Sequence, residues 1–213
     1  MSKKIFIIFV ILIAYSNIIN AQVYEEWVRR YDGPAHSFDY LYDLVIDNFG
    51  NVYIAGASDG INSSYDCTTI KYNNNGDILW IQRYNGPGNS QDEIEEIILD
   101  ESGNIYVTGS SAGLGTSTDF VTIKYNSSGE QQWVQRYNGS TNAIDLAHSI
   151  AVDIAGNVYV TGSTYGSGSD YYDYATVKYN SNGVQQWVQR YNGPGNYTDI
   201  SRSIGIDNSG NVY

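Results

Sequence analysis

Cysteine and basic residues are scarce in this sequence, and each scarcity narrows what the protein can be. The only cysteine, Cys67, has no partner for an internal disulfide, and we expect it to be a small apolar residue on a strand face. Eleven lysines and arginines stand against 23 aspartates and glutamates, a net charge of −12. A chain this acidic repels phosphate backbones, so we expect no nucleic-acid partner.

A long apolar run is also missing. The run at residues 5–15 has eleven residues, whereas a membrane-spanning helix needs about 20. It follows Lys3 and Lys4 and precedes Ala21, the order typical of a secretory signal peptide. We therefore expect cleavage after Ala21 and a mature chain, residues 22–213, that is secreted or held at the cell surface without a membrane span. A buried first strand or a membrane anchor is the alternative for residues 1–21.

Helical periodicity is absent after residue 21, which excludes helical solenoids. Proline is rare (3), whereas tyrosine (21) and glycine (22) are abundant. Tyrosine is frequent in strands and glycine in tight turns, so this composition predicts strands joined by short turns. The hydrophobic fraction of 42% is enough to build a core and argues against disorder.

What the sequence does contain is a repeated phrase. Residues 124–139 read Lys-Tyr-Asn-Ser-Ser-Gly-Glu-Gln-Gln-Trp-Val-Gln-Arg-Tyr-Asn-Gly and return almost unchanged at residues 178–193. The tryptophans are spaced 53, 53 and 54 residues apart, at Trp27, Trp80, Trp133 and Trp187. A fixed period of this length is the mark of a repeat protein. Three repeats are complete and a fourth is not, at residues 27–79, 80–132, 133–186 and 187–213.

Each repeat carries signals for four strands. In the first, a strand ends at Ile46, a turn with Asp47 and Gly50 follows, and the second strand is expected at residues 52–56. The third, at residues 67–72, alternates between two unlike faces, and the fourth contains the tryptophan. Four strands in about fifty residues predict one blade of a β-propeller. We expect the first strand of each blade to line the central channel and the tryptophan strand to lie outermost.

The segment at residues 23–31 is then an outermost strand without a blade of its own. In closed propellers such a strand commonly completes the last blade. Because propellers use about four to eight blades, we expect the remaining blades in a longer, full-length chain. The predicted fold class is therefore an incomplete all-β propeller of four-stranded antiparallel blades, with about three and a half blades present.

The units Asp-x-x-Gly-Asn-Val-Tyr-Val-Thr-Gly-Ser, Asp-x-x-Thr-x-Lys-Tyr-Asn and Gly-x-x-x-Trp resemble the SBBP family, the β-propeller repeats of bacterial secreted proteins. The resemblance covers essentially all of residues 27–213. It implies a seven-bladed propeller in a secreted or cell-surface chain. It brings no catalytic motif to carry over.

No pattern in the residues indicates catalysis, a cofactor or a metal. His36 and His148 fall at different places in their repeats, and neither has a recurring carboxylate or serine partner. The acidic run at residues 92–96 is unique to one repeat, and we interpret it as a solvated strand end rather than a pair of carboxylates for acid–base work. Catalytic residues should be those that break the repeat, so carboxylates or a histidine converging at the channel mouth would favour an enzyme.

The simplest interpretation of the recurring aspartates is that they stabilise the structure of each blade. Those that begin the first tight turn should cap backbone N–H groups, with calcium as the alternative: Asp47, Asp100, Asp153 and Asp207. Those before the first and third strands should accept hydrogen bonds inside the blade, with a ring of carboxylates around the channel mouth as the alternative: Asp39, Asp92, Asp145, Asp199, Asp66, Asp119 and Asp173.

The loop at residues 163–174 is the best candidate for a binding site. In a propeller, the loops between the second and third strands emerge on the same side as the loops between blades, and they are long enough to shape a site. This loop is the least repetitive, and its aromatic and acidic side chains suit sugar rings: Tyr165, Asp170, Tyr171, Tyr172 and Asp173. A flexible loop whose tyrosines pack on the neighbouring blade is the alternative.

These observations favour a binding or scaffold module whose partner is a carbohydrate or another surface protein. The alternative is a fragment of an extracellular propeller enzyme that acts on glycans.

Overall fold

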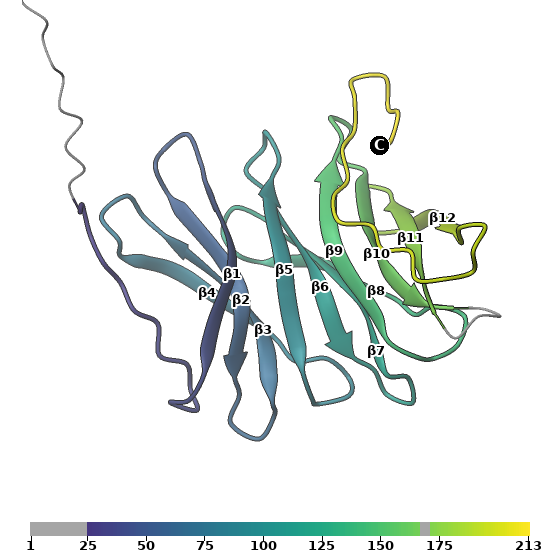
Figure 1. Ribbon diagram of the computed structural model, residues 1–213. Helices are drawn as coiled ribbons and strands as arrows, with labels where there is room; N and C mark the ends of the chain where they lie inside the picture. Colours follow the sequence, from purple (N-terminus) through teal and green to yellow (C-terminus); the bar gives the residue numbers. More distant parts are fainter. Residues whose placement is uncertain (1–24, 167–170) are drawn as a thin grey trace, which may run out of the picture.

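The computed structural model describes residues 25–166 and 171–213, and within these ranges it contains three four-stranded antiparallel sheets and no helix. We call the sheets blades A, B and C (Figure 1). Blade A comprises β1 (Asp39–Ile46), β2 (Val52–Asp59), β3 (Tyr65–Tyr72) and β4 (Ile78–Tyr84). Blade B comprises β5 (Asp92–Leu99), β6 (Ile105–Ala112), β7 (Thr118–Tyr125) and β8 (Gln131–Tyr137). Blade C comprises β9 (Asp145–Val152), β10 (Val158–Tyr165), β11 (Tyr172–Tyr179) and β12 (Gln185–Tyr191).

In every blade the strands pair in the order in which they occur in the sequence. The first strands β1, β5 and β9 lie side by side, and β1 contacts β5 as β5 contacts β9. The tryptophan strands β4, β8 and β12 form the opposite edges of the sheets. Beyond blade C, residues 206 and 212 form a single antiparallel bridge, the beginning of a fourth unit. The prediction of an incomplete all-β propeller is therefore confirmed.

The first turn of each blade is held by its aspartate. Asp47 Oδ1 accepts hydrogen bonds from the backbone amides of Phe49 and Asn51, both at 2.9 Å. Its Oδ2 accepts from Asn51 Nδ2 at 2.7 Å and from the Tyr53 hydroxyl at 3.1 Å. Gly50 follows with a φ of 78°, a conformation that favours glycine. The same pattern recurs at Asp100, Asp153 and Asp207, so these carboxylates cap their turns, as predicted.

The second and third strands are longer than the sequence pattern predicts. The ladder between β10 and β11 continues through the pairs Ser163–Tyr174, Thr164–Asp173 and Tyr165–Tyr172. The predicted loop at residues 163–174 is therefore strand at both ends, and only residues 166–171 connect the two strands. The backbone groups of the extra residues find partners across the ladder, which outweighs the weak strand preference of the glycine and serine around them.

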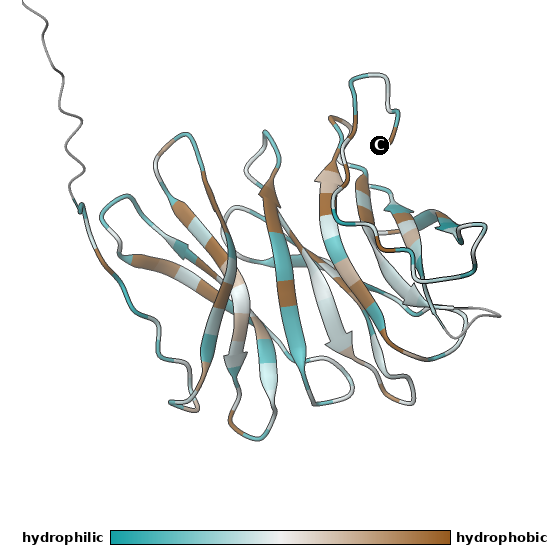
Figure 2. Cartoon of the chain, in the orientation of Figure 1, coloured by the Kyte–Doolittle hydropathy of each residue, from teal (hydrophilic) through white to brown (hydrophobic). Residues whose placement is uncertain are grey.

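Apolar side chains pack between neighbouring blades. Figure 2 shows hydrophobic and hydrophilic residues alternating along several strands. One core cluster joins Tyr53 and Cys67 of blade A to Ile94 and Val107 of blade B. A second joins Phe120 of blade B to blade C. Cys67 is 2% exposed, which confirms the expected place on a strand face.

The tryptophans tie each blade to the next. Trp80 Nε1 donates to Ser127 O at 3.4 Å, and its ring covers Gly129 of blade B. Trp133 makes the same contacts with Ser181 O, at 3.1 Å, and Gly183 of blade C.

The N-terminal segment repeats this contact on blade A. Trp27 donates to Asn74 O at 3.1 Å and covers Gly76. Residues 25–31 therefore occupy the place of the outermost strand of a preceding blade, as the sequence predicted. They form no ladder, because no neighbouring strand pairs with them within the described part of the chain.

The long loops and the tight turns lie at opposite ends of the blades. In Figure 1 the turns that follow β1, β5 and β9 point upward, and the loops that follow β2 and β6 point downward. Loops of the second kind are joined to the inter-blade loops by backbone hydrogen bonds, such as Gly88 N to Ala112 O at 3.1 Å and Ser117 N to Asn142 O at 3.1 Å. We call this end the loop side. The described ranges include no helix that is long and apolar enough to cross a bilayer.

Candidate functional site

Most recurring aspartates are used inside the blades. Asp92 Oδ2 accepts a hydrogen bond from Gly86 N at 2.7 Å, and its Oδ1 accepts from Ala112 N at 3.1 Å. The equivalent aspartates, Asp39, Asp145 and Asp199, bind the corresponding glycine amides. Near the start of the third strand, Asp66 pairs with Arg83 at 3.0 Å and Asp119 with Arg136 at 2.8 Å. These contacts confirm the structural role of these aspartates. Asp173 is buried as well, but its Oδ1 has no hydrogen-bond partner within the described residues.

The acidic run at residues 92–96 is only in part the solvated strand end that the sequence predicted, because its four carboxylates go to three different places. Asp92 is buried in its blade, as described above. Glu96 Oε2 accepts a hydrogen bond from Ile150 N of blade C at 2.6 Å. Glu93 and Glu95 instead line a hollow of about 370 Å³ between blades B and C. Glu93 and its neighbour Asp92 differ because successive side chains of a strand point to opposite faces.

We call this hollow the B–C pocket. Its walls come from β5, with Glu93 and Glu95, and from β9, with Leu146 and His148. The start of β11 contributes Tyr172. The remaining lining residues are Gln91, Ser110, Thr118 and Ile144. Most of these residues belong to the loop-side halves of their strands, so the pocket opens on the side that the sequence analysis favours for binding.

The pocket exists because the repeat changes at these positions. Between blades A and B, the equivalents of Glu93 and Thr118 are Tyr40 and Tyr65. The two tyrosine rings contact each other edge to face, with centroids 5.5 Å apart. In blade A these two rings fill the space that the shorter side chains of Glu93 and Thr118 leave open in blade B. The change converts a packed contact into a polar hollow.

The charges around the pocket influence one another. Burial, and then the nearby carboxylate of Glu93, raise the pKa of Glu95, while Arg202 opposes the shift. Burial, and then Arg202, lower the pKa of His148, so its imidazole is neutral at pH 7. His148 Nε2 also shares a hydrogen bond with Ser163 Oγ at 3.0 Å. A pocket with a carboxylate pair, a neutral imidazole and hydroxyls offers hydrogen-bond acceptors and donors in close array.

Sequence analysis missed Glu93, Glu95 and His148 as members of one site. The signal was present, because these residues differ from their counterparts in the other repeats. Their convergence depends on the packing of β5 against β9, which a pattern within one repeat does not reveal.

The five residues predicted from the loop do not gather at one point. Tyr172 lines the B–C pocket, and its ring contacts Tyr165 edge to face at 5.4 Å. Tyr171 turns to Tyr197, which follows blade C, with ring centroids 5.4 Å apart. Asp173 is buried within the ladder. Asp170 lies outside the described residues. Tyr172 alone therefore joins the predicted set to the pocket, and the binding role of the set stays a prediction.

The remaining reactive residues have ordinary roles. His36 is exposed in the loop before β1 and pairs with Asp32 at 2.8 Å. Burial, and then the charge of Asp92, raise the pKa of the Cys67 thiol well above its usual value, so the thiolate nucleophile does not form at neutral pH. Among the described residues, no three His, Cys, Asp or Glu side chains are placed to hold a metal ion.

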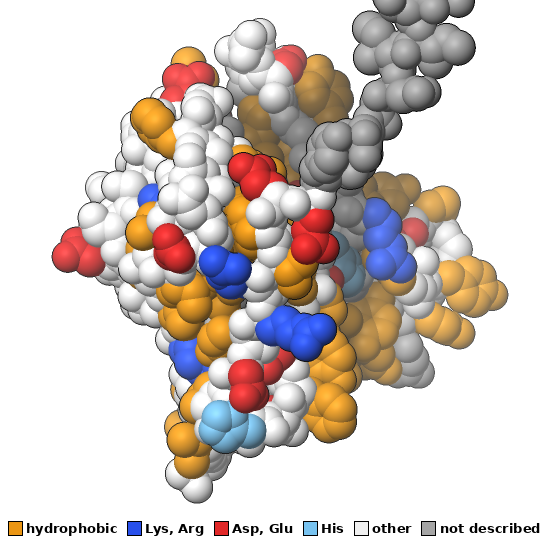
Figure 3. Space-filling model, turned by 90° about the vertical axis from the view of Figure 1, so that its left-hand side faces the viewer, with side chains coloured by type: hydrophobic (Ala, Val, Ile, Leu, Met, Phe, Trp, Pro, Cys, Tyr) orange, Lys and Arg blue, Asp and Glu red, His pale blue; other side chains and the backbone are white. Residues whose placement is uncertain are grey.

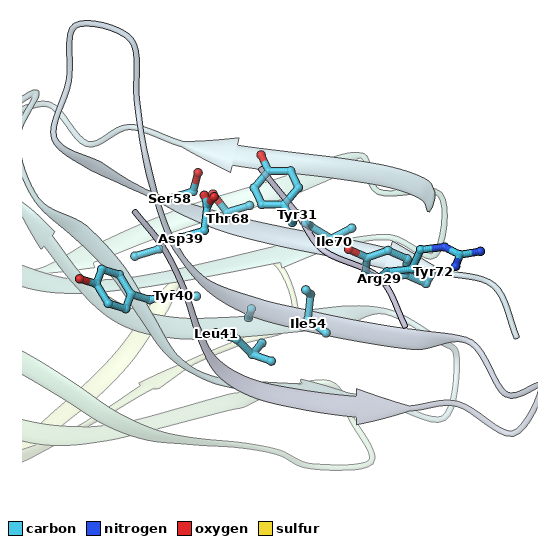
Figure 4. A pocket seen from close by; sticks show the side chains of 13 residues that line it. Arg29, Tyr31, Asp39, Tyr40, Leu41, Ile54, Ser58, Thr68, Ile70 and Tyr72 are labelled. Atoms are coloured by element: carbon cyan, nitrogen blue, oxygen red, sulfur yellow. The ribbon is translucent and has the colours of Figure 1, made fainter. Parts of the chain in front are cut away.

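A second hollow, of about 190 Å³, lies between the N-terminal segment and blade A. Figure 4 shows Tyr31 and Arg29 on one side of it and Leu41 and Ile54 on the other. The residue equivalent to Leu41 in blade B is Ile94, which is fully covered by blade A. This hollow is thus an uncovered blade face rather than a shaped ligand site.

Comparison with known proteins agrees with the architecture. No curated protein matches the chain. Two segments, residues 79–115 and 132–168, match the family described as SBBP, beta-propeller repeat. Each matched segment runs from a tryptophan strand through the first two strands of the following blade and into the loop after them. These two segments are therefore similar to β-propeller repeats of the SBBP family.

Proposed function

We propose that the protein is a secreted or cell-surface binding module that holds a carbohydrate in the B–C pocket. The pocket itself carries the proposal. Carboxylates accept hydrogen bonds from sugar hydroxyls, and these charge-assisted bonds are stronger than neutral ones. Ser110, Thr118 and His148 add neutral donors and acceptors, and the Tyr172 ring supplies an apolar face. A hydroxyl-rich ligand satisfies this mixture, whereas a purely apolar ligand would leave the carboxylates without partners.

The binding test is a glycan array followed by calorimetry. Glu93→Ala should weaken binding about tenfold or more, because it removes a charged acceptor worth about 1.4 kcal/mol or more. Tyr172→Ala should also weaken binding. Glu101→Ala is the matched control, since Glu101 is exposed in a tight turn at the opposite end of blade B. Equal affinity of wild type and the Glu93→Ala variant would remove the B–C pocket as the site.

An enzyme acting on glycans is the second candidate, and one observation favours it. Glu93 and Glu95 share a pocket, and burial raises the pKa of Glu95, as expected of a general acid beside a second carboxyl group. Incubation with end-labelled glycans separates the two functions. Turnover by the wild type that disappears in Glu95→Gln, with binding retained, identifies an enzyme. Binding without turnover identifies a binding module.

Secretion is the part of the proposal that concerns residues 1–21, which lie outside the described residues. Lys3, Lys4 and the apolar run before Ala21 support it. Sequencing of the exported protein from its N-terminus should begin at Gln22. Mature material that still contains Lys3 would contradict the signal peptide.

A further inference from the structure

Three aromatic rings form an exposed row beside the B–C pocket. Phe38 precedes β1, and Tyr40 and Tyr42 lie on it at alternate positions. Consecutive ring centroids are 6.3 and 6.4 Å apart, and their planes are within 14° and 26° of parallel. The three side chains are 62%, 45% and 43% exposed. We call them the aromatic row. Tyr65 packs edge-on against Tyr40 from β3 and supports the row from behind.

The aromatic row and the walls of the B–C pocket occupy equivalent positions in successive repeats. Phe38, Tyr40 and Tyr42 correspond to Gln91, Glu93 and Glu95 at the start of blade B, and to Ile144, Leu146 and His148 at the start of blade C. The second and third sets line the pocket. Because β1 contacts β5, the aromatic row borders the acidic wall on the side away from His148. After burial, the charges of Glu93 and Glu95 contribute most to raising the pKa of Tyr42.

The last residue of each of these three sets is the extra residue of a β-bulge. The register shifts between Leu41 and Asp43 on β1 and between Ile94 and Glu96 on β5, which leaves Tyr42 and Glu95 outside the regular pairing. On β9 the same place belongs to His148. A bulge re-aims the side chain of its extra residue. The same β-bulge thus occurs in all three blades, but the side chain of its extra residue differs. In this way a repeat fold can vary a binding surface without disturbing the hydrogen-bonded ladder.

We propose that the aromatic row is a stacking subsite for a carbohydrate chain, one unit of which occupies the B–C pocket. This proposal rests on the function proposed above. The apolar face of a sugar ring stacks on an aromatic ring, and the hydroxyls at its edge are then near the carboxylates of β5. Three rings in line exceed the area that one sugar unit can cover, so the row selects chains over single sugars.

The test is calorimetry with the whole chain and four neutral oligosaccharide series. The probes are α-1,4-linked glucose, β-1,4-linked glucose, β-1,4-linked mannose and β-1,4-linked xylose, each from one to six units. For the wild type, affinity for at least one series should rise about tenfold or more between one and four units. Tyr42→Ala should abolish this increase and leave the affinity for the single sugar within about twofold. Tyr42→Phe, which keeps the ring, should restore the increase.

Two further variants separate a failure of this proposal from a failure of the pocket. Phe38→Ala should reduce the increase with length, and Phe49→Ala should not, since Phe49 is exposed in the turn at the opposite end of blade A. Undiminished length dependence in Tyr42→Ala would overturn the stacking subsite while the pocket stands. Loss of all binding in Glu93→Ala but not in Tyr42→Ala supports the pocket. Wild-type protein that binds no member of any series contradicts both proposals for neutral glycans.

Discussion

Asp145 shows how the surroundings of one residue set its chemistry. Its carboxylate is buried at the start of β9 and accepts a hydrogen bond from Gly139 N at 2.5 Å. Burial raises the pKa of Asp145 to about 6, although the Gly139 amide and Arg190 oppose the shift. The unfolded carboxyl group titrates near pH 3.9. Its favourable contribution to folding is therefore complete below about pH 4 and is lost as the pH rises through about 6.

Replacement of Asp145 by asparagine should remove this pH dependence, because asparagine does not ionise. The free energy of unfolding of Asp145→Asn, relative to wild type, should rise between pH 4.5 and pH 7. Asp153→Asn provides a control of opposite sign. Burial tends to raise the pKa of Asp153, but hydrogen bonds from Asn157 and Tyr159 outweigh it and lower the pKa, so the contribution of Asp153 is lost at low pH. Urea unfolding at several pH values measures the free energy of unfolding of both variants. If this free energy changes with pH in the same way in wild type and in Asp145→Asn, the prediction for Asp145 is wrong.

Trp133 is the residue whose packing between blades can be tested most directly. Its ring lies near Tyr106 and Tyr179, with centroids 6.4 and 6.2 Å away, and its Nε1 donates to Ser181 O. Trp133→Ala should lower the free energy of unfolding by about 3 kcal/mol, the lower end for a large aromatic residue because the ring is only partly covered. Trp187→Ala is the control. Trp187 contacts Tyr159 of its own blade, so its loss should be about 1 kcal/mol. Equal losses would show that the inter-blade contact is unimportant.

At the scale of the strand, adjacent glutamates of β5 have different tasks. Glu96 Oε2 binds Ile150 N of blade C, as Asp43 Oδ2 binds Ile97 N of blade B at 3.0 Å. Ser149 Oγ makes the same contact with Ile204 N beyond blade C, at 3.3 Å. A side chain on each first strand thus bonds the backbone of the next. Glu95, one residue away, lines the B–C pocket instead.

The two glutamates should therefore separate stability from binding. Glu96→Ala leaves the Ile150 amide without its acceptor and should cost about 1–3 kcal/mol. Glu95→Ala removes a side chain that lies outside the regular pairing of the ladder, and it should change stability by less than about 0.5 kcal/mol while weakening ligand binding. Denaturant unfolding of both variants measures the change in stability, and calorimetry measures the change in ligand binding. A stability loss in Glu95→Ala as large as that in Glu96→Ala would contradict this division.

The sequence predicted those elements whose cause is local. The turn at Asp47 and Gly50 has its capping group and its left-handed glycine within four residues, so its pattern is readable in one repeat. The ends of β10 and β11 were not predicted, because Tyr165 and Tyr172 become strand only by pairing with each other. The B–C pocket was not predicted either. It depends on a bulge that turns Glu95 outward and on the contact of two repeats.

At the scale of the whole molecule, blade A differs from blade B in what covers its outer face. Leu41 on blade A is 56% exposed, whereas its equivalent in blade B, Ile94, is 0% exposed. Figure 3 views this face from the left of Figure 1 and shows hydrophobic side chains spread across it. Within the described part of the chain, only the N-terminal segment lies against it, through Trp27 and Arg29. Open apolar faces of this kind associate in water.

We therefore predict that the isolated chain, residues 22–213, forms dimers or larger assemblies at micromolar concentration. Leu41→Glu should shift the population toward the monomer, because a carboxylate buried in the contact would lose its hydration. Leu114→Glu is the matched control. Leu114 is 82% exposed in the loop between β6 and β7 of blade B, and it is not part of the open face of blade A. Sedimentation velocity over a range of concentrations distinguishes the species. A wild-type chain that stays monomeric at every concentration would mean that the face of blade A is covered in solution, which requires the chain to close on itself.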